Sequence, residues 1–298
     1  MSRNLNDIFC VDSSCYTNGQ LDMAVEAILD GDSTGAYYHL ASLLYDEIST
    51  LPEHTRSRKS LYRFTRLPIL SDGSKPIIDD IKKQALTFAN PNGFNDPMDP
   101  ILREWLNRKK KSKLNNLNHR LFIQLLKSID NLRICCLSGN NSAPGHDSMC
   151  LNPLMWAHYA EMHKGICIEY EITDDMISAH NDSDQVLRMA PVRYRNNKIM
   201  NDYITLDNAL LAKGASWNYE NETRRIYYNL DDMRTTRKMG RFKQLCGFRI
   251  NSIYLGYRIK ESDRKDVIKA AKENTINVFQ VRFNDDNITK LVADWVEA

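Results

Sequence analysis

The chain has 298 residues, which is long enough to bury a substantial core without disulfides. Hydrophobic residues make up 42% and charged residues 26% of the total, the balance of a globular protein rather than of a disordered or membrane chain. The formal net charge is only +2, so the electrostatic field of the molecule as a whole does not favour binding to nucleic acid.

The cysteines and the first residues favour a reducing compartment. Seven cysteines, an odd number without a Cys-x-x-Cys pair, are typical of reduced thiols rather than of a disulfide framework or a zinc site. Residues 1–7 lack the basic and then apolar order of a signal peptide. We therefore expect a cytoplasmic protein without a membrane anchor or a bound metal.

Two helices are predicted near the start of the chain. Apolar residues recur at helical spacing over 21–29 and again over 37–44, after an Asp-Gly-Asp turn. The polar stretch 51–59 contains a proline and has the composition of a linker. We expect residues 1–55 to form an N-terminal helical hairpin and residues 56–298 to form a separate α+β domain.

Short strands mixed with helices are predicted from residue 61 onward. The irregular order favours an α+β fold with a mixed, mostly antiparallel sheet as its core and helices around it. Alternating and helical patterns predict strands at 61–65, 86–89, 133–137, 166–171, 192–195, 224–228, 252–255, 277–282 and 288–293, and helices at 77–85, 98–111, 114–129, 153–163 and 260–273.

The first candidate for chemistry is the segment 94–97, Phe-Asn-Asp-Pro. Asp96 precedes a proline, which disfavours helical backbone, so the segment predicts a turn that presents Asn95 and Asp96. The same two residues would also serve simply to cap the following helix. The pattern leaves both interpretations open.

The second candidate is the predicted helix at 153–163. Trp156, Tyr159 and His163 share one face of it, while His158 points elsewhere. An aromatic stripe of this kind more often packs in a core, but a histidine beside aromatic rings also suits a planar ligand.

The third candidate combines Lys213 with the segment 217–225, which begins at Trp217. If this segment is extended, Glu220, Glu222 and Arg224 project from one side; if it is helical, Glu220 and Arg224 form an ordinary surface pair. Neighbouring carboxylates raise one another's pKa, which prepares a general acid or base, although structural ion networks have the same effect.

Basic runs and missing motifs narrow the functional classes. No phosphate-binding loop, dinucleotide fingerprint, serine nucleophile elbow or His-Glu-x-x-His motif occurs, which removes the commonest nucleotide triphosphatases, Rossmann oxidoreductases, serine hydrolases and zinc peptidases. Basic runs of the kind that contact phosphates, although they are usually solvated surface, lie at 56–59, 108–113 and 237–243.

Five ordered motifs resemble a widespread bacterial family of domains of unknown function. The resemblance runs from about Leu61 to Trp295, leaves the N-terminal hairpin outside, and brings no settled activity. The motifs are Leu-Tyr-Arg-Phe at 61–64, Phe-Asn-Asp-Pro at 94–97, Cys-Leu-Ser at 136–138, the helix and strand at 155–168, and Trp-Asn-Tyr-Glu-Asn-Glu-Thr-Arg at 217–224.

The order of the elements is also similar to that of ADP-ribosyltransferases. This weaker resemblance implies that Tyr62 or Arg63 on the first strand holds a dinucleotide and that Ser138 stands on a middle strand. It also implies that the aromatic helix, with Trp156, Tyr159 and His163, faces the nicotinamide, and that the late Glu-x-Glu segment supplies the catalytic Glu222, with Glu220 beside it.

Three functions are consistent with these features, and the sequence does not settle whether the protein is an enzyme. The first is an NAD-consuming ADP-ribosyltransferase or NAD glycohydrolase, acting as a toxin or anti-phage effector, with a nucleic acid or protein as acceptor. Cleavage of the nicotinamide–ribose bond creates oxocarbenium character, which an ionised carboxylate stabilises, while a guanidinium binds the pyrophosphate.

The alternatives belong to other classes. One is a nucleic-acid-directed enzyme or binder in which the basic runs contact phosphates and Asp96, Glu220 and Glu222 hold a metal. The other is a non-enzymatic interaction module whose N-terminal hairpin docks a protein partner.

Overall fold

The fold is α+β, as the sequence predicts. The computed structural model describes residues 19–49, 51, 60–91, 94, 116–140, 148–172, 185–195, 210–230, 241–244 and 248–296. Within these ranges ten strands form one sheet in the order β12-β11-β10-β4-β1-β3-β2-β9, with β8 beside β3 and β5 beside β8. The described pairs in this sheet are antiparallel except that of β10 with β11.

Most elements lie where the sequence patterns place them. The helices are α1 (Gly19–Leu29), α2 (Ser33–Ser49), α3 (Pro76–Lys82), α5 (Asn116–Ile129), α6 (Pro153–Tyr159) and α9 (Glu261–Lys272), with 3-10 helices η3 (Met149–Leu151) and η4 (Ala215–Glu220). The strands are β1 (Ser60–Thr65), β2 (Leu86–Ala89), β3 (Arg133–Gly139), β4 (Ile166–Ile172), β5 (Gln185–Pro191), β6 (Arg193–Arg195), β7 (Ala212–Gly214), β8 (Glu222–Asn229), β9 (Arg241–Gln244), β10 (Phe248–Leu255), β11 (Asn277–Phe283) and β12 (Leu291–Val296).

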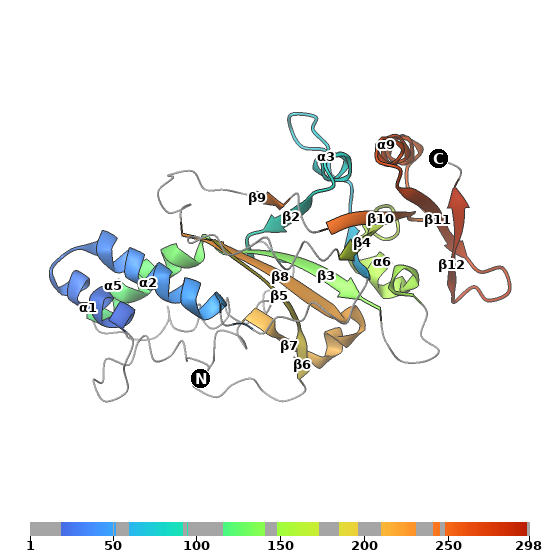
Figure 1. Ribbon diagram of the computed structural model, residues 1–298. Helices are drawn as coiled ribbons and strands as arrows, with labels where there is room; N and C mark the ends of the chain where they lie inside the picture. The colour runs from blue at the N-terminus through green and yellow to red at the C-terminus, as the bar shows by residue number, and fades with distance from the viewer. Residues whose placement is uncertain are drawn as a thin grey trace.

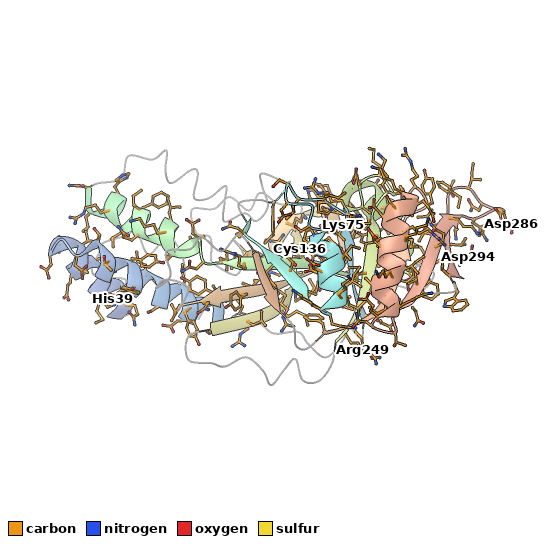
Figure 2. The ribbon with its side chains drawn as sticks, turned by 90° about the horizontal axis from the view of Figure 1, so that it is seen from above. His39, Lys75, Cys136, Arg249, Asp286 and Asp294 are labelled. Atoms are coloured by element: carbon orange, nitrogen blue, oxygen red, sulfur yellow. The ribbon has the colours of Figure 1, made fainter. Side chains whose placement is uncertain are left out.

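The elements spread along one direction. Figure 1 shows α1, α2 and α5 at one end and α9, β11 and β12 at the other, with the sheet between them. Seen from above, the molecule is elongated, with His39 of α2 and Asp286 of the β11–β12 connection at opposite ends and Cys136 of β3 between them (Figure 2). None of the described helices combines the length and apolar character that a bilayer span requires.

The two faces of the sheet bury different side chains, because successive residues of a strand point to opposite sides. We call face A the side that carries Tyr62, Ser138 and Glu222, which lie opposite one another across β1, β3 and β8. Face B is the side that carries Leu61 and Leu137, which belong to a single large hydrophobic cluster.

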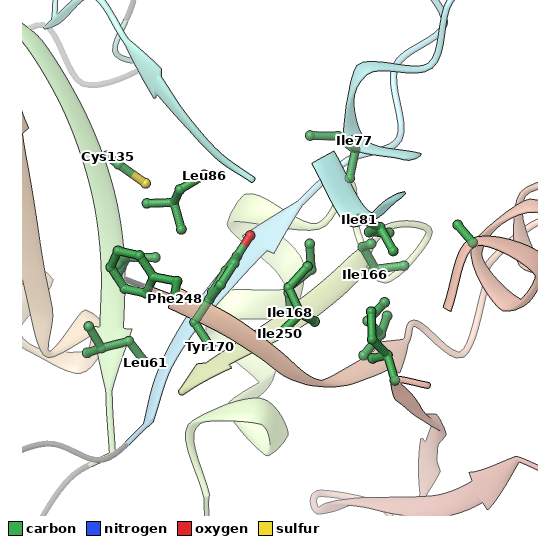
Figure 3. Packing of buried hydrophobic residues seen from close by; sticks show 14 of the residues in the cluster. Leu61, Ile77, Ile81, Leu86, Cys135, Ile166, Ile168, Tyr170, Phe248 and Ile250 are labelled. Carbon is green, nitrogen blue, oxygen red and sulfur yellow. The ribbon is translucent and has the colours of Figure 1, made fainter. Parts of the chain in front are cut away.

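Face B is covered by α3 and α9. Ile168, Tyr170 and Phe248 of the strands pack with Ile81 of α3 and Val267 of α9 in one cluster. Figure 3 shows Ile168, Tyr170 and Phe248 among the aliphatic side chains of this core. Burial of each such side chain stabilises the fold by roughly 1.5–3 kcal/mol.

Face A is covered by two separate groups of helices. At one end α1, α2 and α5 pack on Ile134, Ile226 and Tyr228. At the other end α6 and η3 pack on Tyr62 and Phe64 of β1. The middle of face A, between these two groups, is the place where a ligand can reach the strands.

The predicted N-terminal hairpin is present as α1 and α2, but it does not stand apart from the sheet. It shares a hydrophobic cluster with α5 and with strands β3, β5 and β8. Arg188 of β5 donates through Nη2 to the carbonyl of Ser49 at 2.7 Å. The expected linker at 51–59 falls almost entirely outside the described residues, so the domain boundary at residue 55 stays a prediction.

The predicted helix at 153–163 is shorter than expected. Asn152 caps its first turn, and the helix ends at Tyr159. Residues Glu161, Met162 and His163 then take left-handed backbone, with φ of 50°, 51° and 68°. His163 therefore does not lie on the helical face assigned to it.

This tight connection is pressed against two strands. Gly165 donates its amide to Ala160 at 2.8 Å, and its carbonyl accepts from Gly256 at 3.0 Å. A Cβ on Gly165 would lie 2.1 Å from the carbonyl oxygen of Thr65, so no other residue fits without a backbone shift.

Gly165→Ala is expected to lower the free energy of unfolding by about 1–3 kcal/mol, because the added methyl group meets the backbone of β1. Thermal unfolding followed by circular dichroism measures the change. Gly214→Ala is the control, since its nearest neighbours would lie at 3.8 and 3.9 Å and its φ is −62°. Equal melting temperatures for Gly165→Ala and wild type would contradict this packing.

Candidate functional site

A cavity of about 260 Å³ lies on face A between the two groups of helices. Its wall combines apolar side chains with charged ones from segments far apart in the chain. The lining residues are Tyr62, Arg63, Phe64, Thr87, Ala89, Phe94, Ile134, Cys135, Cys136, Ser138, Met155, Tyr159, Lys213, Glu220 and Glu222.

The cavity lies where two strands share one edge of β3. In the described register β1 pairs with β3 at Leu61↔Gly139 and Tyr62↔Ser138, while β2 pairs with the opposite end of β3 at Ala89↔Ile134. β1 pairs with β4 along its whole length, from Ser60 to Thr65, but with β3 only at Leu61 and Tyr62 in the described register. The strands thus diverge at the point where the cavity opens between them.

Lys213, Glu220 and Glu222 form a charged wall of the cavity, and the buried Arg224 binds Glu222 behind it. The Lys213 ammonium lies 2.6 Å from Glu220 Oε2 and 3.4 Å from Glu222 Oε2. Arg224 donates through Nε to Glu222 Oε1 at 2.8 Å and through Nη1 to the carbonyl of Leu210 at 2.6 Å. The side chains of Lys213, Glu220 and Glu222 are only 6%, 3% and 4% exposed, so these ion pairs are shielded from solvent.

The two glutamates have opposite environments. Burial raises the pKa of Glu220, and the nearby Glu222 charge adds to this, against the lowering effect of Lys213 and Tyr159. Burial also acts to raise the pKa of Glu222, but Arg224 and Lys213 outweigh it and hold that pKa well below the usual range. Such a divided pair is the pattern of one carboxyl group that can carry a proton beside one that stays ionised.

The backbone between the glutamates explains how both reach the cavity. Glu220 ends the 3-10 helix η4, and Glu222 begins strand β8. Asn221 joins them in left-handed backbone with φ of 42°, and its side-chain amide donates to the carbonyls of Gly139 and Asn140. The segment is therefore helical up to Glu220 and extended from Glu222, and Arg224 pairs with Glu222 in the interior instead of forming a surface pair with Glu220.

Aromatic side chains connect this segment to α6. The Tyr159 hydroxyl donates to Glu220 Oε1, and His158 Nδ1 lies 2.7 Å from the Tyr219 hydroxyl. Trp217 lies over Lys213, with 4.9 Å between the ammonium and the ring centroid. The segment that carries the glutamates thus faces the tryptophan-bearing helix rather than solvent.

Tyr62 is fixed at the other side of the cavity. Its hydroxyl donates to Glu169 Oε1 at 3.3 Å and accepts from Asn140 Nδ2 at 3.3 Å, while Tyr254 donates to Glu169 Oε2 at 3.0 Å. Burial raises the pKa of Tyr62 to about 12, so the hydroxyl stays protonated near neutral pH. Ser138 stands between Tyr62 and Glu222 on the neighbouring strand.

Arg63 also contributes to the lining, but its side chain starts from face B, because it follows Tyr62 on the strand. Burial acts to lower the pKa of its guanidinium, and Cys135, Tyr170 and Asp80 outweigh it and raise that pKa. These neighbours place the guanidinium among groups of face B, away from the two glutamates.

Trp156 and His163, two residues of the predicted aromatic stripe, do not line the cavity. Trp156 is fully buried, donates through Nε1 to the carbonyl of Cys150 at 2.7 Å and meets Phe64 edge-on. His163 stacks on Trp156 at 5.9 Å between ring centroids and lies outside the lining. A ligand in the cavity can reach Tyr159 but not the Trp156 ring.

Several sequence candidates lie outside the described residues. These are Asn95 and Asp96, the basic runs at 56–59 and 108–113, and Arg237 with Lys238; Arg241 and Lys243 lie on β9. In the described part of the chain, no group of three or more His, Cys, Asp or Glu side chains is arranged to hold a metal ion.

Other polar residues of the site had no assigned role. Lys213 stands seven residues before Glu220, a spacing that matches no regular element, and Tyr194 accepts the backbone amide of Glu222 at 2.7 Å. Glu169 falls on the predicted strand 166–171, where alternation alone places it on the same side as Cys167. The only sequence signal for a role of Glu169 was a carboxylate on a buried strand.

The family comparison covers this part of the site. Residues 155–225 match the family model described as "Protein of unknown function (DUF2971)". No match was found among curated proteins or among solved structures.

The matched residues include Tyr159, Lys213, Glu220 and Glu222 of the cavity wall. The match is narrower than the expected range of 61–295, so the motifs at 61–64, 94–97 and 136–138 remain only a predicted part of the family. The similarity to ADP-ribosyltransferases also stays a prediction.

Lys213→Met is expected to lower the free energy of unfolding by about 3–5 kcal/mol at pH 7, because it leaves two buried carboxylates without their shared cation. The loss should shrink as the pH falls toward roughly 4. The pKa of Glu220 is raised in the folded protein, so ionisation of this carboxyl group opposes folding at high pH. The cost disappears at a pH low enough to protonate Glu220 in both the folded and the unfolded protein.

Chemical denaturation at several pH values measures this effect. Lys75→Met is the matched control, because its bridges to Asp263 and Asp266 are partly exposed and should be worth about 1 kcal/mol or less. A Lys213→Met loss no larger than that of the control, or one independent of pH, would show that the cluster is not buried as described.

Proposed function

We propose that the protein is an NAD-consuming enzyme of the ADP-ribosyltransferase or NAD glycohydrolase type. The observation that carries the proposal is the pair of buried glutamates on the wall of one cavity, with the pKa of Glu222 lowered and that of Glu220 raised. Tyr62, Ser138 and Tyr159, which the sequence resemblance implies for the dinucleotide, line the same cavity.

The chemistry of the bond fits these groups. When the bond from C1′ of ribose to nicotinamide breaks, the sugar gains positive charge that the ionised Glu222 carboxylate stabilises. Arg224 and Lys213 keep this carboxylate ionised and fixed in position. A carboxylate held in this way needs little reorganisation during the reaction.

The size of the cavity limits how the dinucleotide enters. At about 260 Å³ it lies just below the range of roughly 300–1,000 Å³ that encloses drug-sized ligands. The nicotinamide and its ribose would therefore occupy the cavity, between Phe64 or Phe94 and the glutamates, and the adenylate half would extend outside. Depletion of NAD or modification of a macromolecule in this way is the action of a toxin or an anti-phage effector.

Purified protein is expected to release nicotinamide from NAD⁺, as measured by liquid chromatography. Glu222→Gln should reduce the rate by about 10²–10³-fold, because it removes the charge that faces the ribosyl cation. Glu171→Gln is the control, since Glu171 is paired with Arg249 on the exposed part of β4. Circular dichroism checks that each variant is folded.

Two results would contradict the proposal. The first is the absence of both nicotinamide release and any ADP-ribosylated macromolecule. The second is equal release by wild type and a folded Glu222→Gln variant.

A further inference from the structure

We propose that the cavity has a second activity, hydrolysis of the N-glycosidic bond of a purine nucleoside monophosphate with Glu220 as the proton donor. This inference rests on the proposed function, because it uses the same stabilisation of a ribosyl cation by Glu222. It goes further by assigning Glu220 the role of a general acid, held in place by Lys213 and Tyr159, which cleavage of NAD⁺ does not need.

The two kinds of leaving group make different demands. The nicotinamide of NAD⁺ is a pyridinium, so the electron pair of the broken bond neutralises its nitrogen and the ring departs without any proton. A purine leaves N9 as an anion unless one of its ring nitrogens is protonated. General acid catalysis therefore has a large part to play only for the purine.

The cavity contains a proton-holding unit that fits this demand. Lys213 lies 2.6 Å from Glu220 Oε2 and Tyr159 binds Glu220 Oε1, and all three side chains line the cavity. Burial raises the pKa of the Glu220 carboxyl, while that of Glu222 is lowered. A carboxyl group with a raised pKa and one with a lowered pKa thus stand two residues apart on one wall.

The remaining wall suits a planar base. Phe64, Phe94 and Met155 give it apolar surface beside the charged side chains. The volume of about 260 Å³ fits one nucleoside better than a whole dinucleotide. A mononucleotide would place its base and ribose inside and its phosphate at the entrance.

The reaction balances with water alone. The C1′–N9 bond breaks and its electron pair stays on N9, while the proton of Glu220 moves to a ring nitrogen of the purine. The oxygen of a water molecule then bonds to C1′, and one of its protons returns to the Glu220 carboxylate. The products are the free base and ribose 5-phosphate.

The test compares adenosine monophosphate with NAD⁺ on the same protein across a range of pH. Chromatography should show release of adenine, and Glu220→Gln should reduce this release at least about 100-fold more than it reduces nicotinamide release. Adenine release should fall as rising pH removes the proton of Glu220, and nicotinamide release should lack this limb. Glu171→Gln is again the surface control.

Tyr159→Phe gives a second test if Glu220→Gln does not fold. The Tyr159 hydroxyl lowers the pKa of Glu220, so its removal should move the falling limb of adenine release to higher pH. An unmoved limb would overturn the assignment of Glu220 as the acid.

The outcomes separate the two proposals. Nicotinamide release without adenine release overturns this inference and leaves the proposed function standing. Adenine release without nicotinamide release supports this inference and overturns the proposed cleavage of NAD⁺. Release of neither overturns both, and equal losses of both reactions in Glu220→Gln overturn the role of Glu220 as a donor to the purine.

Discussion

The ammonium group of Lys213 holds two buried carboxylates side by side, and the site depends on this contact. Glu220 and Glu222 would repel each other without it, and burial alone would keep both neutral. Because Arg224 adds a second cation to Glu222, the pKa values of the two carboxyl groups diverge, that of Glu220 raised and that of Glu222 lowered. The chemistry that we propose follows from this inequality.

The sheet provides the space that the ion cluster occupies. β1 and β2 take opposite ends of one edge of β3, so the strands diverge beside Ser138 and Cys136. The described helices of face A pack on either side of this junction, and the cavity lies between them. The N-terminal hairpin therefore has a structural role, since with α5 it forms the group on one side of the cavity.

Sequence reasoning found the elements with regular patterns and missed those set by tertiary contacts. Strand β4 and helix α9 follow their periodicity, whereas β5 contains Arg188 and ends at Pro191, which disguise a buried strand. The Glu-x-Glu segment was located, but its geometry depends on the left-handed Asn221, which no pattern reveals. Lys213 gives no local signal, because its partners are fixed by the packing of β7 against η4 and β8.

Alternation along strands explains two further features. It places Tyr62 and Arg63 on opposite faces of β1, so the two side chains reach the cavity from different sides of the strand. It is also what brings Glu222 and Arg224 to one side, as an extended segment predicts. Whether these residues act on a nucleotide stays a prediction that the geometry supports.

The unequal ionisation of the two glutamates is the central claim, and carbon-13 NMR of protein labelled at the glutamate carboxyl carbons tests it most directly. Glu220→Gln and Glu222→Gln assign the two resonances. The account predicts that the pKa of Glu222 lies below, and the pKa of Glu220 above, the ordinary glutamate value of about 4.3. Two carboxyl groups that titrate together in the ordinary range would contradict it.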